Sequence, residues 1–135
     1  MANSLIIQNL IDGPRNVVVK VTGVLDTSDQ ANTPIVVPAS FAPVPSTFLI
    51  QYLDYSISDQ LEVQLLWDAT ADVVIMPLAG RGRMGFCEFG GLKNNAGAGV
   101  TGAINLQTTG WTSGIQIFTV ILEMIKVGPN GVGVL

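Results

Sequence analysis

Hydrophobic and polar residues alternate along much of the chain with a period of two. In the stretch 61–67 the odd-numbered residues are all apolar, whereas most of the even-numbered ones are polar. The stretch 17–22 likewise places valine at each odd position. This alternation is typical of strands in an antiparallel sheet that has one face in the core and the other mostly in water. The predicted core-facing residues of these two stretches are Val17, Val19, Val21, Leu61, Val63, Leu65 and Trp67.

Two longer stretches, 47–58 and 115–127, extend the pattern. In the first, the alternation predicts one face with Phe48, Ile50 and Tyr52, and another with Leu49, Leu53, Tyr55 and Ile57. The second is apolar on both faces for most of its length. A strand of that kind lies at the centre of a sheet, or a neighbour covers its outer face. We therefore expect 115–127 to be a central or covered strand.

Shorter apolar runs bring the number of predicted strands to eight or nine, and turn residues separate them at fairly regular intervals. Examples of such turns are 12–14 and 94–97, which contain Asp, Asn and Gly. No window longer than about ten residues has the apolar spacing and the caps of a helix. The pattern favours an all-β fold, as a sandwich, a jelly roll or a small barrel. The predicted strands are 5–10, 17–22, 35–37, 47–58, 61–67, 73–78, 86–89, 103–108 and 115–127.

The 135 residues fit one domain, spanning 1–135. The composition excludes several classes of function for this domain. The chain has no histidine, hence no imidazole base and no histidine ligand for a metal. Ten acidic and six basic residues give a net charge of −4, which is the wrong sign for holding nucleic acid through its phosphates. A single cysteine, Cys87, excludes an internal disulfide and a cysteine-rich zinc site.

Targeting signals are not expected either. The first basic residue is Arg15, so no positive segment precedes an apolar one as in a secretory signal. The longest apolar stretch, 115–127, is interrupted by Gln116, Thr119 and Glu123, which excludes a membrane-spanning helix. We therefore predict folding in a reducing cytoplasm and no membrane partner.

The low charge content predicts that part of the protein surface contacts other subunits. Charged residues make up 12% of the chain, roughly half of the ~25% usual for a soluble domain, and the mean hydropathy is +0.49. A small domain has much surface for its volume, so part of this uncharged surface is expected to lie against another subunit. The alternative is that many Gly, Ala and Val residues raise the hydropathy without creating exposed patches. The segments 1–10 and 128–135 are the candidate assembly arms, although 128–135 is alternatively a frayed tail.

The glycine-rich segment 80–102 is predicted to be a long loop around a short strand, and it is a third candidate contact. It contains two matches to the dinucleotide pattern G-x-G-x-x-G, at 80–85 and 97–102. No helical pattern follows either match, as a pyrophosphate site would need, so we expect no cofactor. Arg81 and Arg83 in this segment have two interpretations. They are either anchors for carboxylates of a partner subunit or solvated loop residues.

Candidate catalytic and metal-binding residues lack the neighbours that their chemistry needs. Ser113 has no histidine to activate it and is not in a G-x-S-x-G motif. Cys87 is expected to be a buried, inert thiol because apolar residues flank it. Asp68, Thr70 and Asp72 alternate as in a calcium loop, but too few carboxylates are present, and an ordinary turn is favoured. We therefore predict no catalytic residue, no metal site and no enzyme activity.

Six segments together form a familiar pattern over most of the chain. They are Asp12–Asn16, Leu25–Asp29, Asp54–Asp59, Leu65–Asp72, Phe89–Gly99 and Thr108–Trp111. The pattern resembles a family of small virion proteins of tailed bacteriophages, and it is similar to the jelly-roll cement, or decoration, proteins that sit on a capsid shell. The resemblance implies an antiparallel β-sandwich, jelly-roll-like, with eight or nine short strands.

The function that this resemblance implies is structural. A cement protein binds the phage major capsid protein on the surface of the virion, after synthesis in the cytoplasm of the host bacterium, and bridges its subunits. Copies placed around symmetry axes also contact each other, so a homodimer or homotrimer is expected. The candidate interface residues are Arg15, Arg81, Arg83 and Trp111. The alternatives are another phage structural part, either tail or head-tail, and a non-catalytic carbohydrate-binding β-sandwich that uses Trp67 or Trp111.

Overall fold

A computed structural model describes residues 3–41, 45–94, 97 and 99–127. This part of the chain forms nine strands and two short 3-10 turns, and it contains no α-helix, so the predicted all-β class is confirmed. The elements are β1 (Ser4–Asp12), β2 (Asn16–Leu25), β3 (Thr33–Val36), η1 (Pro38–Ser40), β4 (Thr47–Ile57), β5 (Glu62–Trp67), β6 (Val73–Leu78), β7 (Arg81–Gly85), η2 (Cys87–Phe89), β8 (Ile104–Thr109) and β9 (Gln116–Val127).

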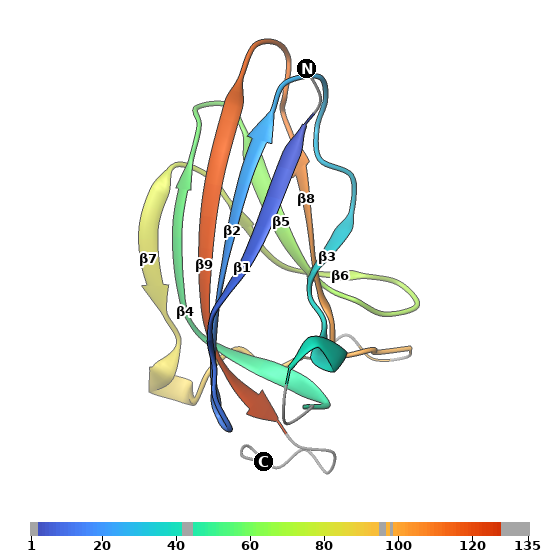
Figure 1. The fold of residues 1–135 in the computed structure, drawn as a ribbon, viewed down its shortest axis with the longest axis vertical. Coiled ribbons are helices and arrows are strands. Elements are labelled where there is room, and N and C mark those ends of the chain that lie inside the picture. Colours follow the sequence, from blue (N-terminus) through green and yellow to red (C-terminus); the bar gives the residue numbers. More distant parts are fainter. Residues whose placement is uncertain (1–2, 42–44, 95–96, 98, 128–135) are drawn as a thin grey trace.

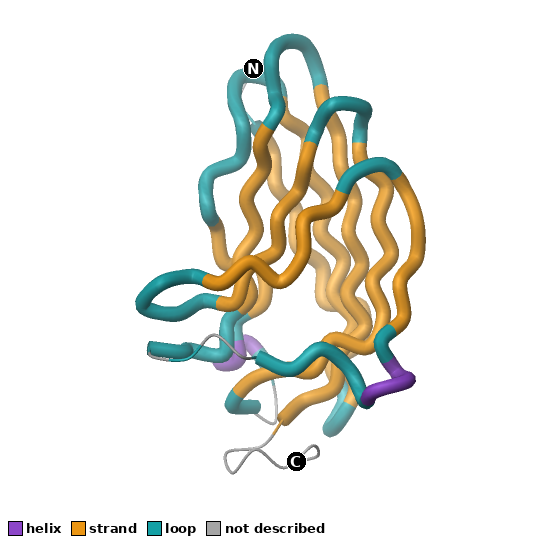
Figure 2. Tube along the Cα trace, turned by 180° about the vertical axis from the view of Figure 1, so that it is seen from behind, coloured by secondary structure: helices purple, strands orange, loops and turns teal. Residues whose placement is uncertain are grey.

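The strands form two antiparallel sheets that face each other across the core (Figure 1). One sheet has five strands in the order β1-β2-β9-β4-β7, and the other has four in the order β3-β8-β5-β6. Seen from behind, most of the loops lie towards the two ends of the molecule, and one loop projects from its side (Figure 2). The predicted antiparallel sandwich is therefore confirmed.

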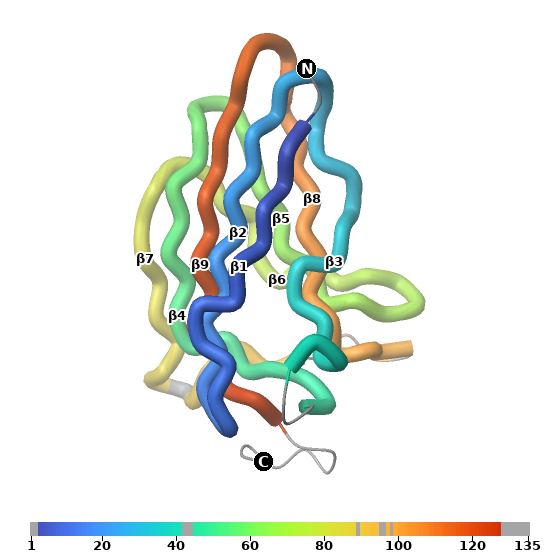
Figure 3. Tube along the Cα trace, viewed as in Figure 1, coloured from blue at the N-terminus to red at the C-terminus, as the bar shows by residue number. Residues whose placement is uncertain are grey.

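The strand pairs are nested in the sequence. β2 pairs with β9, β3 with β8, β4 with β7 and β5 with β6. Figure 3 shows the consequence, because the blue β2 and the red-orange β9 lie side by side although they are far apart along the chain. The chain thus wraps like one long hairpin, with successive pairs falling in alternate sheets. This is a jelly-roll arrangement of eight strands, and β1 adds a ninth at the edge of the larger sheet.

The core is drawn from the alternating positions of both sheets. β9 is the third of five strands, as expected for a strand that is apolar on both faces. Every core-facing residue predicted for 17–22 and 61–67 is buried, and so are the alternate apolar residues of β9. The fully buried members include Val17, Val19, Val21, Val63, Leu65, Val120 and Leu122.

A bulge in β4 changes which of its residues face the core. The pairing of β4 with β9 shifts between Ile50 and Tyr52, which leaves Gln51 as the extra residue. Before the bulge Phe48 and Ile50 are buried, and after it Leu53 and Ile57 are buried. The predicted grouping of Tyr52 with Phe48 and Ile50 is therefore wrong, because uninterrupted alternation cannot be continued through a bulge.

The seventh strand lies earlier than predicted. Residues 86–89 were expected to be a strand, but Cys87–Phe89 form the 3-10 turn η2, and the strand β7 is Arg81–Gly85. Its glycines lie under two tyrosine rings of β4. A Cβ on Gly82 would come within 3.0 Å of the Tyr55 hydroxyl, and a Cβ on Gly85 within 2.7 Å of the Tyr52 ring. A Cβ at either position would therefore have to displace a tyrosine ring, so the glycines allow the rings to pack closely on this strand.

The two candidate arms have different outcomes. Residues 4–10 form most of β1 and pair with β2, so this part of the segment 1–10 belongs to the sheet. The segment 128–135 lies outside the described residues.

Candidate interaction surfaces

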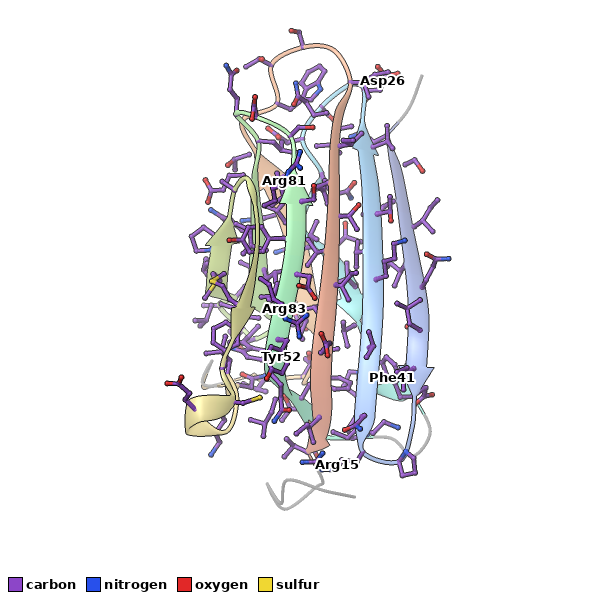
Figure 4. The ribbon with its side chains drawn as sticks, turned by 90° about the vertical axis from the view of Figure 1, so that its left-hand side faces the viewer. Arg15, Asp26, Phe41, Tyr52, Arg81 and Arg83 are labelled. Atoms are coloured by element: carbon purple, nitrogen blue, oxygen red, sulfur yellow. The ribbon has the colours of Figure 1, made fainter. Side chains whose placement is uncertain are left out.

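The outer face of the five-stranded sheet is an open surface of the described chain. Figure 4 views the molecule from this side, and no other described element crosses in front of the strands. Residues directly opposite each other in antiparallel strands share a face. Arg81 and Arg83 lie opposite Ser56 and Asp54, respectively, so both arginines project from the same outer face. The two arginines lie on the strand β7, although the segment 80–102 was predicted to be mainly a loop.

Arg83 joins three strands on this face. Its Nη1 donates to Asp54 Oδ2 of β4 at 2.6 Å and lies 3.1 Å from Glu123 Oε2 of β9. Its guanidinium carbon lies 4.5 Å from the centre of the Tyr52 ring, within the range of a cation–π contact. The carboxylates that Arg83 binds here are the chain's own. Half of its side chain remains exposed, so the group is still accessible to a partner.

The surroundings of Arg83 shift two pKa values. The hydrogen bond to Asp54, followed by the charges of Asp54 and Glu123, raises the pKa of Arg83. The pKa of Tyr52 is raised above its ordinary value of 10.0, mainly by a hydrogen bond with Cys87. Cys87 is exposed, so the predicted burial of this thiol is wrong. The reason is that Cys87 begins the turn η2, which leaves the sheet after β7, and not a core strand.

Two shallow grooves flank this arginine pair. The upper groove, of about 310 Å³, is lined by residues of β4, β7 and β9, among them Arg81, Ser56, Thr119 and Ile121. Within the described part of the chain, Arg81 makes no ion pair. It therefore offers a guanidinium beside an apolar side chain, the combination that suits a carboxylate on a partner protein.

Arg15 lies at the lower end of the same face, in the turn between β1 and β2 (Figure 4). Its Nη1 donates to Asn16 Oδ1 at 3.2 Å, and its carbonyl accepts from the backbone N–H of Lys126 at 2.8 Å. It lines the second groove, of about 280 Å³, together with Ile11, Tyr52 and other residues. The three predicted arginines are thus spread along one face and not clustered at one point.

Trp111 belongs to a different region, the loop between β8 and β9. Its backbone N–H donates to Asp29 Oδ1 at 3.0 Å, and its indole Nε1 donates to the carbonyl of Gly114 at 2.9 Å. The ring is half-buried and packs against the core. Both of its N–H groups therefore have acceptors, Asp29 in the connection between β2 and β3 and Gly114 in its own loop, and the indole acts as a fixed part of this end of the sandwich.

The oxygen-rich turn 68–72 joins β5 to β6 and is held by hydrogen bonds. Thr101 Oγ1 donates to Asp68 Oδ2 at 2.6 Å, and the side-chain amide of Asn105 donates to Asp68 Oδ1 at 3.0 Å and Asp72 Oδ2 at 3.3 Å. The backbone N–H of Ala69 donates to Asp72 Oδ1 at 3.1 Å. All four carboxylate oxygens thus accept hydrogen bonds from the chain, which stabilises the turn.

Hydrogen bonds lower the pKa of Asp72, first the one from the backbone N–H of Ala69 and then the one from the side chain of Asn32, which donates to Asp72 Oδ2 at 2.8 Å. A lowered folded-state pKa stabilises the fold above the ordinary value of 3.8, and this contribution is lost as the pH falls through the lower folded-state pKa. We expect Asp72→Asn to lower the free energy of unfolding by about 1 kcal/mol at neutral pH. The reason is that the new side-chain NH₂ group would face N–H donors that now bind a carboxylate oxygen.

The difference between wild type and Asp72→Asn should shrink as the pH falls below about 4, as measured by urea unfolding across a pH series. The matched control is Asp59→Asn in the exposed turn before β5, which should leave the stability unchanged. A difference that stays constant down to pH 2 would contradict the assignment.

The described residues form neither a metal-binding cluster nor a membrane-spanning helix. Among the described residues, no group of three or more Cys, Asp and Glu side chains is placed to hold a metal ion. No helix in the described part of the chain is long and apolar enough to cross a membrane. No protein-family model matches the chain, and its comparison with curated proteins gives no significant match.

The partners of Arg83 could not be predicted from the sequence, because they depend on which strands pair.

Proposed function

We propose that this chain is a structural virion protein that binds the capsid shell of a tailed bacteriophage as a cement protein. The observation that carries the proposal is the open outer face of the five-stranded sheet. The outer side chains of β9 include Ile117, Thr119 and Ile121, and Ile117 is 55% exposed. Charged side chains share this face, with Lys20 of β2 opposite Ile121, and with Asp54 and Glu123 paired to Arg83. A broad face of this kind suits a protein partner better than a small ligand.

The jelly-roll order supports the proposal by analogy, since viral capsid domains share this arrangement. Lectins share it as well, so the fold alone does not separate a cement protein from a carbohydrate-binding module. The tryptophans weigh against the module. Trp67 is only 2% exposed and cannot stack on a sugar, and both N–H groups of Trp111 already donate within the chain, to Asp29 and to Gly114. The alternative role in a tail or head-tail complex has no observation in its favour.

Deleting this protein from a phage that encodes it should leave shells that assemble but rupture at a lower temperature. A cement protein stabilises the shell by the free energy with which it binds the assembled state. The measurement is release of the packaged DNA, followed by dye fluorescence during heating, and the purified chain added back should restore the rupture temperature. Shells of unchanged strength that lack tails would contradict the proposal, and so would saturable glycan binding that is lost in Trp111→Ala.

A pair of point variants locates the contact. We expect Ile117→Lys on the outer face to weaken binding to stripped shells by at least about tenfold, since it places a charge in an apolar contact. The matched control is Val74→Lys on β6, in the other sheet, where the side chain is 46% exposed. Val74→Lys should bind as wild type. Equal losses in both variants would contradict docking through the outer face.

A further inference from the structure

The strand β1 has an open edge. It lies at the end of the five-stranded sheet, and within the described chain it pairs with β2 and with no other strand. Figure 4 shows no described element beyond it on that side. An edge strand presents a row of backbone N–H and C=O groups that another strand can pair with, and proteins usually protect such edges.

The other three sheet edges carry the usual protection. β7 places two arginines, Arg81 and Arg83, at its edge of the larger sheet. In the smaller sheet, β6 contains Pro77, and β3 is only four residues long and contains Pro34. Charged side chains, prolines and short strands all hinder pairing with a further strand.

β1 lacks these features over nearly its whole length. It has nine residues, and the segment 4–11 contains neither a charged residue nor a proline. Its large apolar side chains are exposed, with Ile6 at 53%. They lie on both faces of the strand: Ile6 is opposite Thr22 on the outer side, and Ile7 is opposite Val21 on the core side. The four exposed members are Ile6, Ile7, Leu10 and Ile11.

The lack of charge on β1 and the symmetry of self-pairing favour a second copy of this chain as the occupant of this edge. The chain has a net charge of −4, so two copies repel each other over most approaches. The segment 4–11 carries no charge, and a second copy would bring the same neutral, apolar strand to it. A strand that pairs with itself in an antiparallel sense generates a twofold axis, and this single contact covers both open edges. The bulge near Leu10 leaves 4–9 in an unbroken register for such pairing.

We propose that two copies of this chain form a homodimer through antiparallel pairing of their β1 edges, which creates one continuous ten-stranded sheet. The pairing adds backbone hydrogen bonds and buries the exposed isoleucines of both copies on the two faces of the new sheet. The inference does not rest on binding to a shell, because the dimer forms in solution from the chain alone.

The test is the oligomeric state of the full chain, measured by sedimentation equilibrium over a range of concentrations. Wild type should be a dimer, and Ile6→Lys should raise the dissociation constant at least tenfold, because each copy then brings a lysine to the paired edge. Ile117→Lys is the matched control, with an isoleucine of nearly equal exposure two strands away from the edge. It should dimerise as wild type does, even if it no longer binds shells.

Hydrogen exchange provides an independent measurement on the unmodified chain. Amides of β1 should exchange more slowly at concentrations where the dimer forms than after dilution, whereas amides of β3 and β6 should not change. Wild type that stays monomeric at all concentrations would overturn the proposal. A dimer that Ile6→Lys does not weaken, or one that leaves β1 exchange unchanged, would also overturn it. A monomer that gains β1 protection only on a shell would assign the edge to a foreign strand.

Discussion

Replacing Asp12 by alanine is expected to lower the free energy of unfolding by about 3 kcal/mol. Asp12 is the partner of Lys126, whose side chain is fully buried between the sheets at the lower end of the sandwich. The Lys126 Nζ donates to Asp12 Oδ1 at 2.9 Å and lies 5.9 Å from the centre of the Phe41 ring. Without the carboxylate the ammonium group loses its counter-charge in an apolar site, and such a loss is strongly destabilising.

The opposite change should be much milder. Lys126→Met removes the buried charge and keeps an apolar side chain of similar length, and Asp12, a third exposed, then stays hydrated. We expect it to cost less than about 1.5 kcal/mol, and the double variant Asp12→Ala with Lys126→Met should recover most of the loss caused by Asp12→Ala. Denaturant unfolding of all three variants measures this. If Asp12→Ala and Lys126→Met lowered the free energy of unfolding equally, the result would contradict the description of Lys126 as the buried member of the pair.

The second large effect is expected at Gly23. This glycine of β2 lies opposite Phe118 of β9 on the core side, and a Cβ at this position would overlap the Phe118 ring. The ring is 1% exposed and is held by the surrounding core. Gly23→Ala therefore forces the ring or the strand to move, and overpacking of this kind costs about 2–3 kcal/mol.

A smaller residue at position 118 should relieve the clash. We expect the loss in Gly23→Ala with Phe118→Leu to be less than the sum of the two single losses, which a double-mutant cycle in urea measures. The control is Gly13→Ala in the turn after β1, where the nearest atom to an added Cβ is the Asn16 carbonyl oxygen at 3.4 Å. Gly13→Ala should change the stability by about 0.5 kcal/mol or less. Additive losses at Gly23 and Phe118 would contradict the packing described.

Alternation along the sequence predicted most of the fold for a physical reason. Eight of the nine predicted strands overlap observed ones, because most of them bury one face or lie inside a sheet; β1, which lies at an edge and is exposed on both faces, was located by its apolar run alone. β7 was missed because its two glycines break the apolar pattern. They leave room for the rings of Tyr52 and Tyr55 on the neighbouring strand, and that packing is visible only once β4 and β7 are paired.

The interaction surfaces were less predictable, since they depend on contacts between distant residues. Arg81 and Arg83 share a face because they are two positions apart on β7, a strand that the sequence pattern did not predict. The Asp54 and Glu123 carboxylates that hold Arg83 come from two other strands, so only the pairing order reveals them. Lys126 is an extreme case, because its buried ammonium group is bound by Asp12, 114 residues away.

The central position of β9 has a consequence for the order in which the protein folds. β9 is the last described strand to leave the ribosome, yet β2 and β4 are joined in the larger sheet only through it. Until residues 116–127 are free, β2 and β4 have no common partner, whereas β5 and β6 can form a local hairpin early. Long-range pairing of this kind makes folding slow, on the order of milliseconds to seconds. Folding therefore begins at the inner hairpin and is completed after synthesis of β9, when the last strand enters the middle of its sheet.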